Sequence, residues 1–69
     1  MSEPKYRHED CERLTNSFYL EVENNTTVNE ALKSTVLGII ETAAKLLKEK
    51  DYKLWQTFMW LGESVWHKR

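Results

Sequence analysis

The spacing of apolar residues is ambiguous before residues 24–27 and clearly helical after them. The segment Asn24-Asn25-Thr26-Thr27 is a break, because such side chains hydrogen-bond to their own backbone and favour turns. Beyond it, apolar residues recur every three or four positions over about 28–49 and again over about 52–67. This is the period of an α-helix with one apolar face, so the pattern predicts two long helices.

The expected start of each long helix carries a capping signal. Thr27-Val28-Asn29-Glu30 matches a capping box, which predicts that Thr27 caps the helix over 28–49. Asp51 is the expected cap of the helix over 52–67. Only Lys48-Glu49-Lys50 lies between the two helices, so the pattern predicts a tight turn and an antiparallel helical hairpin.

The segment over about 9–23 carries two competing patterns. Cys11, Leu14, Phe18 and Val22 recur at helical spacing, whereas Phe18, Leu20 and Val22 also alternate with polar residues as in a strand. No other part of the chain offers a partner strand, and a two-stranded unit is marginal by itself. A helix is therefore favoured, and a strand remains the alternative if a second copy supplies its neighbour. Residues 1–8 have no such pattern and are expected to form a flexible tail.

The two long helices have more apolar surface than a hairpin alone can bury. Each apolar face covers nearly half of the helix circumference, about twice the width that two facing helices cover. The first segment is expected to cover part of the remainder, and a two-fold dimer to cover the rest. The residues expected in this core or dimer contact are Leu37, Ile40, Ala44, Trp55, Met59 and Trp66. Ser34, Gly38 and Thr42 form a narrow strip of small residues beside the apolar face of the helix over 28–49. Gly38 either lets another backbone approach this strip closely or has no structural role.

These patterns predict an all-α fold with one helical domain over 9–69. It is a three-element bundle, made of the hairpin and the first segment and completed by dimerisation. With 69 residues, the chain is too short for two separate cores. Its one cysteine allows no internal disulfide. The sequence also contains neither an apolar run long enough for a membrane span nor a leader, so we expect a cytoplasmic protein without membrane contact.

Charge is divided unevenly along the chain. The formal net charge is −1, but residues 1–30 carry three basic and seven acidic side chains, whereas residues 31–69 carry seven basic and four acidic ones. Lysines 45, 48, 50 and 53 form a short basic run that acidic residues interrupt. The predicted helix over 52–67 presents aromatic and aliphatic side chains rather than basic ones, which is unfavourable for a helix that enters a DNA groove. Nucleic acid is therefore an unfavoured partner.

The sequence lacks the residue groupings that catalysis or metal binding requires. His8-x-x-Cys11 offers one pair of ligands, but a structural zinc site needs four, so we expect no metal and no other cofactor. Glu9, Asp10 and Glu12 surround Cys11 in the sequence and disfavour its thiolate, which points to a buried thiol rather than a nucleophile. No catalytic residues are assigned, and the protein is not expected to be an enzyme.

Trp60 is the most informative aromatic residue. All three tryptophans lie in the last fifteen residues, and Trp60 falls on the polar side of its helix. Tryptophan is enriched at binding hot spots because it buries a large rigid area. The expected partner-binding residues are Trp60, Gln56, Glu63 and His67. Glu9, Asp10 and Glu12 form a second, acidic contact surface suited to a basic partner.

Three functional hypotheses follow, in order of preference. The first is a non-catalytic protein–protein interaction module that regulates or inhibits a partner protein and acts as a helical homodimer. The second is a nucleic-acid-associated transcriptional regulator that uses the lysines near the interhelical turn. The third is a small-ligand binder or very small enzyme with a site at a dimer seam, which requires Cys11, a histidine and a carboxylate to converge there.

Overall fold

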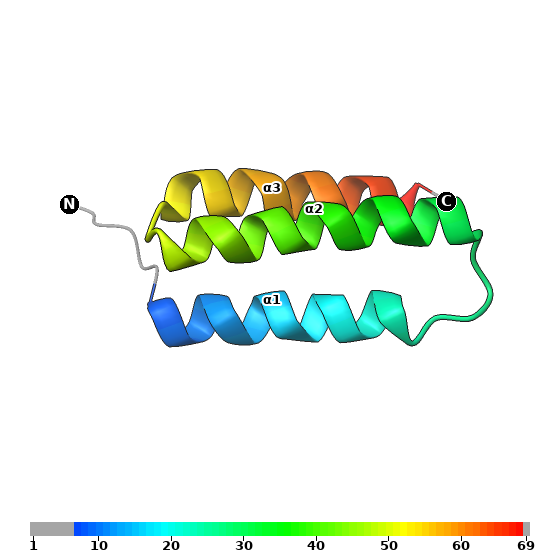
Figure 1. Ribbon diagram of the computed structural model, residues 1–69, viewed down its shortest axis with the longest axis horizontal. Coiled ribbons are helices and arrows are strands. Elements are labelled where there is room, and N and C mark those ends of the chain that lie inside the picture. Colours follow the sequence, from blue (N-terminus) through cyan, green and yellow to red (C-terminus); the bar gives the residue numbers. More distant parts are fainter. Residues whose placement is uncertain (1–6, 69) are drawn as a thin grey trace.

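Three α-helices make up the described part of the chain. The computed structural model describes residues 7–68, and its helices are α1 (His8–Glu23), α2 (Glu30–Lys48) and α3 (Tyr52–His67). Consecutive helices run in opposite directions, so that α1 and α3 point the same way (Figure 1). Helix α2 packs against both of the others. The all-α class and the three-element bundle are therefore confirmed, and the strand alternative for residues 9–23 is wrong.

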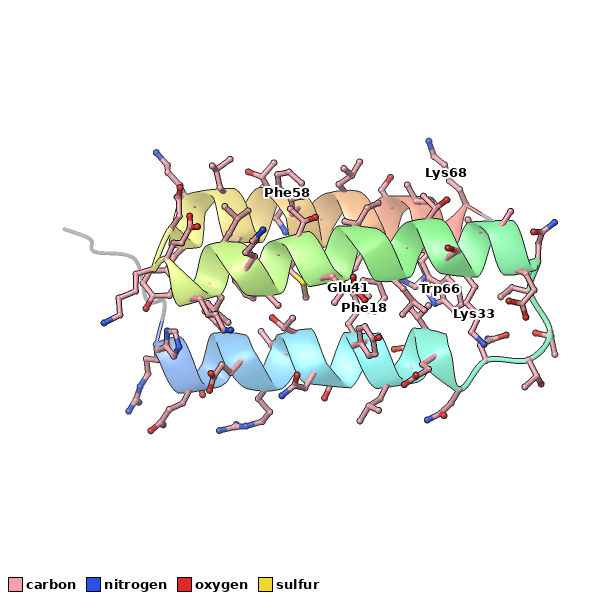
Figure 2. The ribbon with its side chains drawn as sticks, in the orientation of Figure 1. Phe18, Lys33, Glu41, Phe58, Trp66 and Lys68 are labelled. Atoms are coloured by element: carbon pink, nitrogen blue, oxygen red, sulfur yellow. The ribbon has the colours of Figure 1, made fainter. Side chains whose placement is uncertain are left out.

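Each helix buries four residues at the same spacing. In every helix the spacing is four, three and four residues, which places the four side chains on one narrow stripe, as in coiled coils. The buried residues are Cys11, Thr15, Phe18 and Val22 in α1, Val36, Ile40, Ala43 and Leu47 in α2, and Trp55, Met59, Gly62 and Trp66 in α3. Figure 2 shows Phe18 and Trp66 in the space between the helices. The core thus lies where these three stripes meet.

Gly62 lies at a close contact of all three helices. A Cβ atom at this position would lie 3.3 Å from Cε2 of Phe18 in α1 and 3.3 Å from Cγ2 of Ile39 in α2. A hydrogen in place of a methyl group therefore lets α3 approach both neighbours, and it makes room for the phenyl ring of Phe18. The glycine costs helix propensity, about 1 kcal/mol relative to alanine, and this contact explains why it is found within a helix.

A short chain of buried hydrogen bonds joins α3 to α1. The indole Nε1 of Trp55 donates to the hydroxyl of Thr15 over 2.8 Å, and that hydroxyl donates to the carbonyl of Cys11 over 2.7 Å. Thr15 is only 4% exposed and is the one buried polar residue among residues 7–68. Since a hydrogen bond is directional and apolar contacts are not, this pair and the bond between His8 and Tyr52 at 2.9 Å together set the register of α1 against α3.

Helix α2 begins later than the capping box predicts. Its cap is Asn29, whose side chain accepts from the backbone N–H of Ala31 over 2.6 Å. Thr27 belongs instead to the preceding loop, where its N–H and its hydroxyl both donate to the side-chain oxygen of Asn25, over 2.9 and 3.0 Å. The prediction of Thr27 as the cap was wrong because Asn25 already engages the threonine in a local turn.

The turn between α2 and α3 is a Schellman motif without glycine. The N–H of Asp51 donates to the carbonyl of Leu46 over 3.0 Å, and the N–H of Lys50 donates to that of Leu47 over 2.9 Å. Lys50 has a φ of 61°, in the left-handed region that glycine normally occupies at this position. Asp51 caps α3 as predicted, and its carboxylate accepts from the N–H of Leu54 over 3.4 Å.

The structure moves the start of the first helix and decides between the two alternatives for Gly38. The predicted tail over residues 1–8 lies outside the described residues except for its last two, and there Arg7 is the N-cap of α1 and His8 is its first residue. At Gly38, a Cβ atom would have no neighbour within 4 Å. No backbone of the described chain therefore approaches this glycine.

We predict that Lys50→Gly stabilises the protein by about 0.5–1 kcal/mol, because glycine adopts the left-handed conformation without the steric cost that Lys50 bears. Urea unfolding followed by circular dichroism measures the change. The matched control is Lys45→Gly, which replaces an exposed lysine inside α2 and should lower the free energy of unfolding by a similar amount. If Lys50→Gly also lowers the free energy of unfolding, the strained conformation of Lys50 is contradicted.

We predict that Thr15→Val lowers the free energy of unfolding by about 1–2 kcal/mol, because the indole of Trp55 loses its hydroxyl acceptor in a buried site. Thr15→Ser keeps that hydroxyl and should recover part of the loss. Thr57→Val is the control, since the Thr57 hydroxyl also bonds a carbonyl one turn earlier, that of Lys53 at 3.1 Å, but is exposed. A loss in Thr15→Val no larger than in Thr57→Val would show that the buried bond does not stabilise the fold.

Candidate interaction surface

Trp60 projects from the bundle beside a groove between α1 and α3. Its side chain is 63% exposed, and Leu14 on α1 is 57% exposed. A hollow of about 160 Å³ lies next to both residues. Its lining consists of Leu14, Trp55, Gln56, Met59, Trp60 and Glu63. The floor is therefore apolar, and a carboxylate and an amide stand at its edge.

The structure brings three of the four predicted partner-binding residues together. Gln56, Trp60 and Glu63 line the same groove, because they are spaced four and three residues apart on α3. His67 is exposed but lies two turns beyond Trp60 and does not line the groove. Leu14 completes the site from α1, although its spacing with Cys11 and Phe18 favoured a core position. It is exposed because the buried stripe of α1 passes through Thr15 instead, one residue further along the helix.

The predicted acidic surface occupies the first turns of α1. Glu9, Asp10 and Glu12 are all exposed there. Acidic side chains in a first turn also interact favourably with the positive end of the helix dipole. Two of the three have a neighbouring basic side chain: Arg13 lies 3.6 Å from Asp10, and Nε2 of His8 lies 3.5 Å from the carboxylate of Glu12. Asp10 is one helical turn before Leu14, so the acidic surface is continuous with the groove.

The residues expected in a core or dimer contact divide into three groups. Ile40, Trp55, Met59 and Trp66 are buried within the single chain. Leu37 is half-buried against that core. Ala44 is exposed and so lies outside the core of the single chain, where the neighbouring Ala43 has the buried position on the α2 stripe.

Cys11 lies in the core and not in a reactive setting. Its side chain is 2% exposed, and burial, together with the charge of Asp10, raises the pKa of the thiol above its ordinary value. The thiol is therefore protonated at neutral pH. His8 instead bonds the hydroxyl of Tyr52 through Nδ1 over 2.9 Å. The hollow of about 140 Å³ beside His8 and Glu12 is not lined by Cys11, so these three groups do not converge on one cavity.

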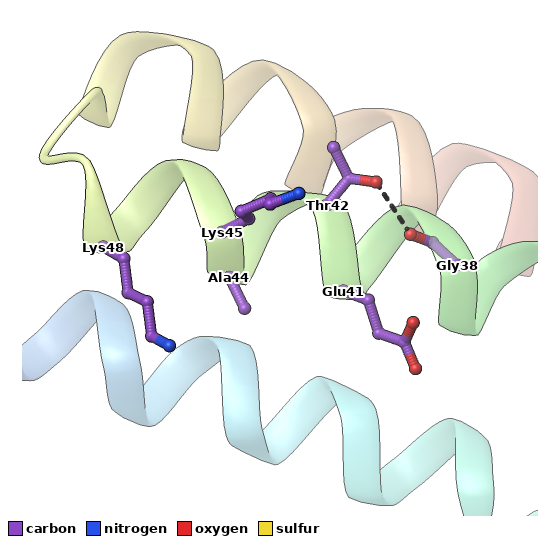
Figure 3. A pocket seen from close by; sticks show the side chains of 6 residues that line it. All are labelled: Gly38, Glu41, Thr42, Ala44, Lys45 and Lys48. Carbon is purple, nitrogen blue, oxygen red and sulfur yellow. Dashed lines mark hydrogen bonds between the residues drawn. The ribbon is translucent and has the colours of Figure 1, made fainter.

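The hollow shown in Figure 3 follows the surface of α2. Its volume is about 430 Å³, and all of its lining residues come from that one helix. They are Gly38, Glu41, Thr42, Ala44, Lys45 and Lys48. The Thr42 hydroxyl donates to the carbonyl of Gly38 over 3.0 Å, within the helix itself (Figure 3). A surface formed by a single helix encloses no ligand, in contrast to ordinary small-molecule sites.

Two features are absent from residues 7–68. No group of three or more histidine, cysteine, aspartate or glutamate side chains is placed to hold a metal ion in this part of the chain. Within the same range, every helix is too short or too polar to cross a membrane.

Comparisons of the chain with protein-family models, with curated proteins and with solved structures find no match. The groove beside Trp60 and the charges around it are therefore the basis for inferring a function.

Proposed function

We propose that this protein is a non-catalytic interaction module that binds a partner protein, regulates or inhibits it, and acts as a homodimer. The single observation that carries the proposal is the exposure of Trp60 beside an apolar groove. An indole ring that is 63% exposed leaves a large apolar area in water, and contact with a partner would remove it.

The composition of the groove supports a protein as its occupant. Trp60 and Leu14 offer apolar contact, while Gln56 and Glu63 offer polar groups at the edge. Protein interfaces commonly combine such an aromatic anchor with a polar rim. The groove is too small to enclose most small-molecule ligands, which require about 300 Å³ or more, but it accommodates one side chain of a partner.

The acidic first turns of α1 support a basic surface on that partner. Glu9 carries no ion pair among those found in residues 7–68, Asp10 pairs only with the exposed Arg13, and Glu12 has only the half-buried His8 beside it. Exposed charges of this kind contribute mainly to the rate of association and to the choice of partner, rather than to affinity. We therefore expect a partner with an apolar anchor for the groove and lysine or arginine residues beside it.

Nucleic-acid association is the second candidate, and one observation favours it. Lys45, Lys48, Lys50 and Lys53 are all exposed near the α2–α3 turn. Glu49 and Asp51 lie among them, which weakens their combined attraction for phosphate. A mobility-shift measurement with duplex DNA at about 50 mM salt separates the candidates, because phosphate-dominated binding is strong at low salt.

We predict that Trp60→Ala weakens binding of the partner at least tenfold, because removal of a hot-spot tryptophan costs about 2 kcal/mol or more. The wild-type chain, immobilised, is used to capture proteins from the cells that produce it. The captured protein is then purified and its affinity measured by calorimetry. Leu20→Ala is the matched control, since Leu20 is 53% exposed but lies on the outer side of α1.

The proposal requires a specific order of affinities: wild type equal to Leu20→Ala, and both above Trp60→Ala. An unchanged affinity in Trp60→Ala would exclude the groove as the binding surface. Equal loss in both variants would show that exposed apolar area in general causes the capture.

A further inference from the structure

The α2–α3 pair has a second apolar face, on the side away from α1. On α3, this face consists of Leu54, Phe58, Leu61 and Val65, which repeat the four-three-four spacing of the buried stripe about 100° around the helix. On α2, it consists of Leu32, Ile39 and Leu46, spaced seven residues apart. We call these seven residues the uncovered face. Leu54 is 44% and Leu61 48% exposed, and the other five residues are half-buried.

Contacts within the chain place both halves of this face on one side. Ile39 lies on the side of α2 that faces α3, because its Cγ2 would contact a Cβ atom at Gly62 at 3.3 Å. Leu32 and Leu46 share that side of α2, since seven residues make nearly two full turns. Phe58 points away from α1 (Figure 2). The described helices therefore cover the inner side of the α2–α3 pair and leave Leu54 and Leu61 exposed on this one.

The uncovered face and its borders carry no charge. At 100° per residue, no charged side chain within α2 or α3 falls within about 50° of the middle of either stripe. The borders are formed by small or hydroxylated residues that are all exposed: Gly38 and Thr42 beside α2, and Thr57 and Ser64 beside α3. This uncharged surface contrasts with the outer side of α1, where five carboxylates are exposed.

We infer that the uncovered face is the homodimer interface and that a second copy of this chain covers it. The inference rests on the proposed function and deepens it by assigning the surface. In a two-fold dimer, residues near the axis meet their own copies, so that any charge there would face a like charge. A face without charge avoids this repulsion and can therefore pack against its own copy. A membrane-binding face would instead be bordered by lysine and arginine.

The size of the face reaches the lower bound for a specific interface. Helices of 16 residues are about 24 Å long, and two side by side are about 20 Å wide, which gives roughly 500 Å² per copy. Two copies would bury about 1,000 Å², the lower bound for a specific interface. The resulting assembly has a four-helix centre made of two α2–α3 pairs, and α1 packs on the outside of each pair.

This arrangement leaves both partner-binding grooves open. Trp60 lies about 130° around α3 from the middle of the uncovered face, at the contact with α1. The dimer therefore presents two Trp60 grooves on separate surfaces and binds a partner bivalently. Bivalent binding raises the apparent affinity for a partner that itself has two or more sites.

Sedimentation equilibrium tests the inference. We expect the wild-type chain to have twice the 8.3 kDa of the single chain at about 100 µM, and Leu61→Glu to have the mass of one chain with its helical circular dichroism retained. Leu20→Glu is the control, because it places the same charge on an exposed leucine of α1, and it should remain dimeric. Thr42→Arg introduces a charge at the border without altering a buried residue and should also give single chains.

Each contrary outcome overturns the assignment. A wild-type chain of 8.3 kDa at this concentration excludes the dimer, and vesicles of anionic lipid that bind it and not Leu61→Glu would make the face a membrane surface. If Leu61→Glu and Thr42→Arg both remain dimeric, another surface joins the copies. The proposed function fails separately: it fails if Trp60→Ala, still dimeric, retains full partner affinity.

Discussion

A single helix packs against only one side of a pair of helices, and this constraint governs the whole molecule. Helix α1 covers the side of the α2–α3 pair that contains Val36, Ile40, Trp55 and Trp66. The chain contains no fourth helix among its described residues, so the opposite side of the pair keeps Leu54 and Leu61 exposed and five further apolar residues only half-buried. A domain of this size buries only about 60% of its unfolded surface, and the arrangement of the helices determines where the uncovered remainder lies.

The three helices are held in register by a small number of specific contacts. Gly62 admits the ring of Phe18 between the helices, and the bond from Trp55 to Thr15 aligns α1 with α3. Since α1 packs mainly on α2, its position along α3 is fixed by two directional contacts, this hydrogen bond and the one between His8 and Tyr52. The position of α1 in turn determines the groove, because Leu14 forms one wall of it and Trp60 the other.

Periodicity in the sequence was sufficient to predict the helices but not their contacts. The apolar period identified α2 and α3 within two residues of their ends, and Asp51 was recognised as a cap from its place before an apolar run. The cap at Thr27 was wrong because Asn25 competes for the same groups, which depends on loop geometry that a motif does not contain. An apolar face that spans nearly half of a helix circumference shows how much of the helix surface must be covered. It does not show which part of that face packs on which neighbouring helix.

The α3 residues of the candidate site were predictable from the sequence, but its α1 residue was not. Trp60 was identified from its position opposite the apolar face, and Gln56 and Glu63 follow from helical spacing. Leu14 was missed as a surface residue, since a leucine at core spacing beside Cys11 and Phe18 is expected to be buried. Its exposure depends on the rotation of α1 about its axis, which places Thr15 rather than Leu14 on the buried stripe, in reach of Trp55, and which no local pattern encodes.

The central claim is that α1 covers one side of the α2–α3 pair and a second copy covers the other. Isotope-filtered nuclear Overhauser spectra test it most directly, on a sample in which carbon-13-labelled and unlabelled chains are mixed. The account predicts contacts between copies at the methyl groups of Leu54, Leu61 and Val65, and none at Leu14 or the Trp60 indole. Contacts between copies at Leu14 or Trp60, or no contact between copies at any position, would contradict it.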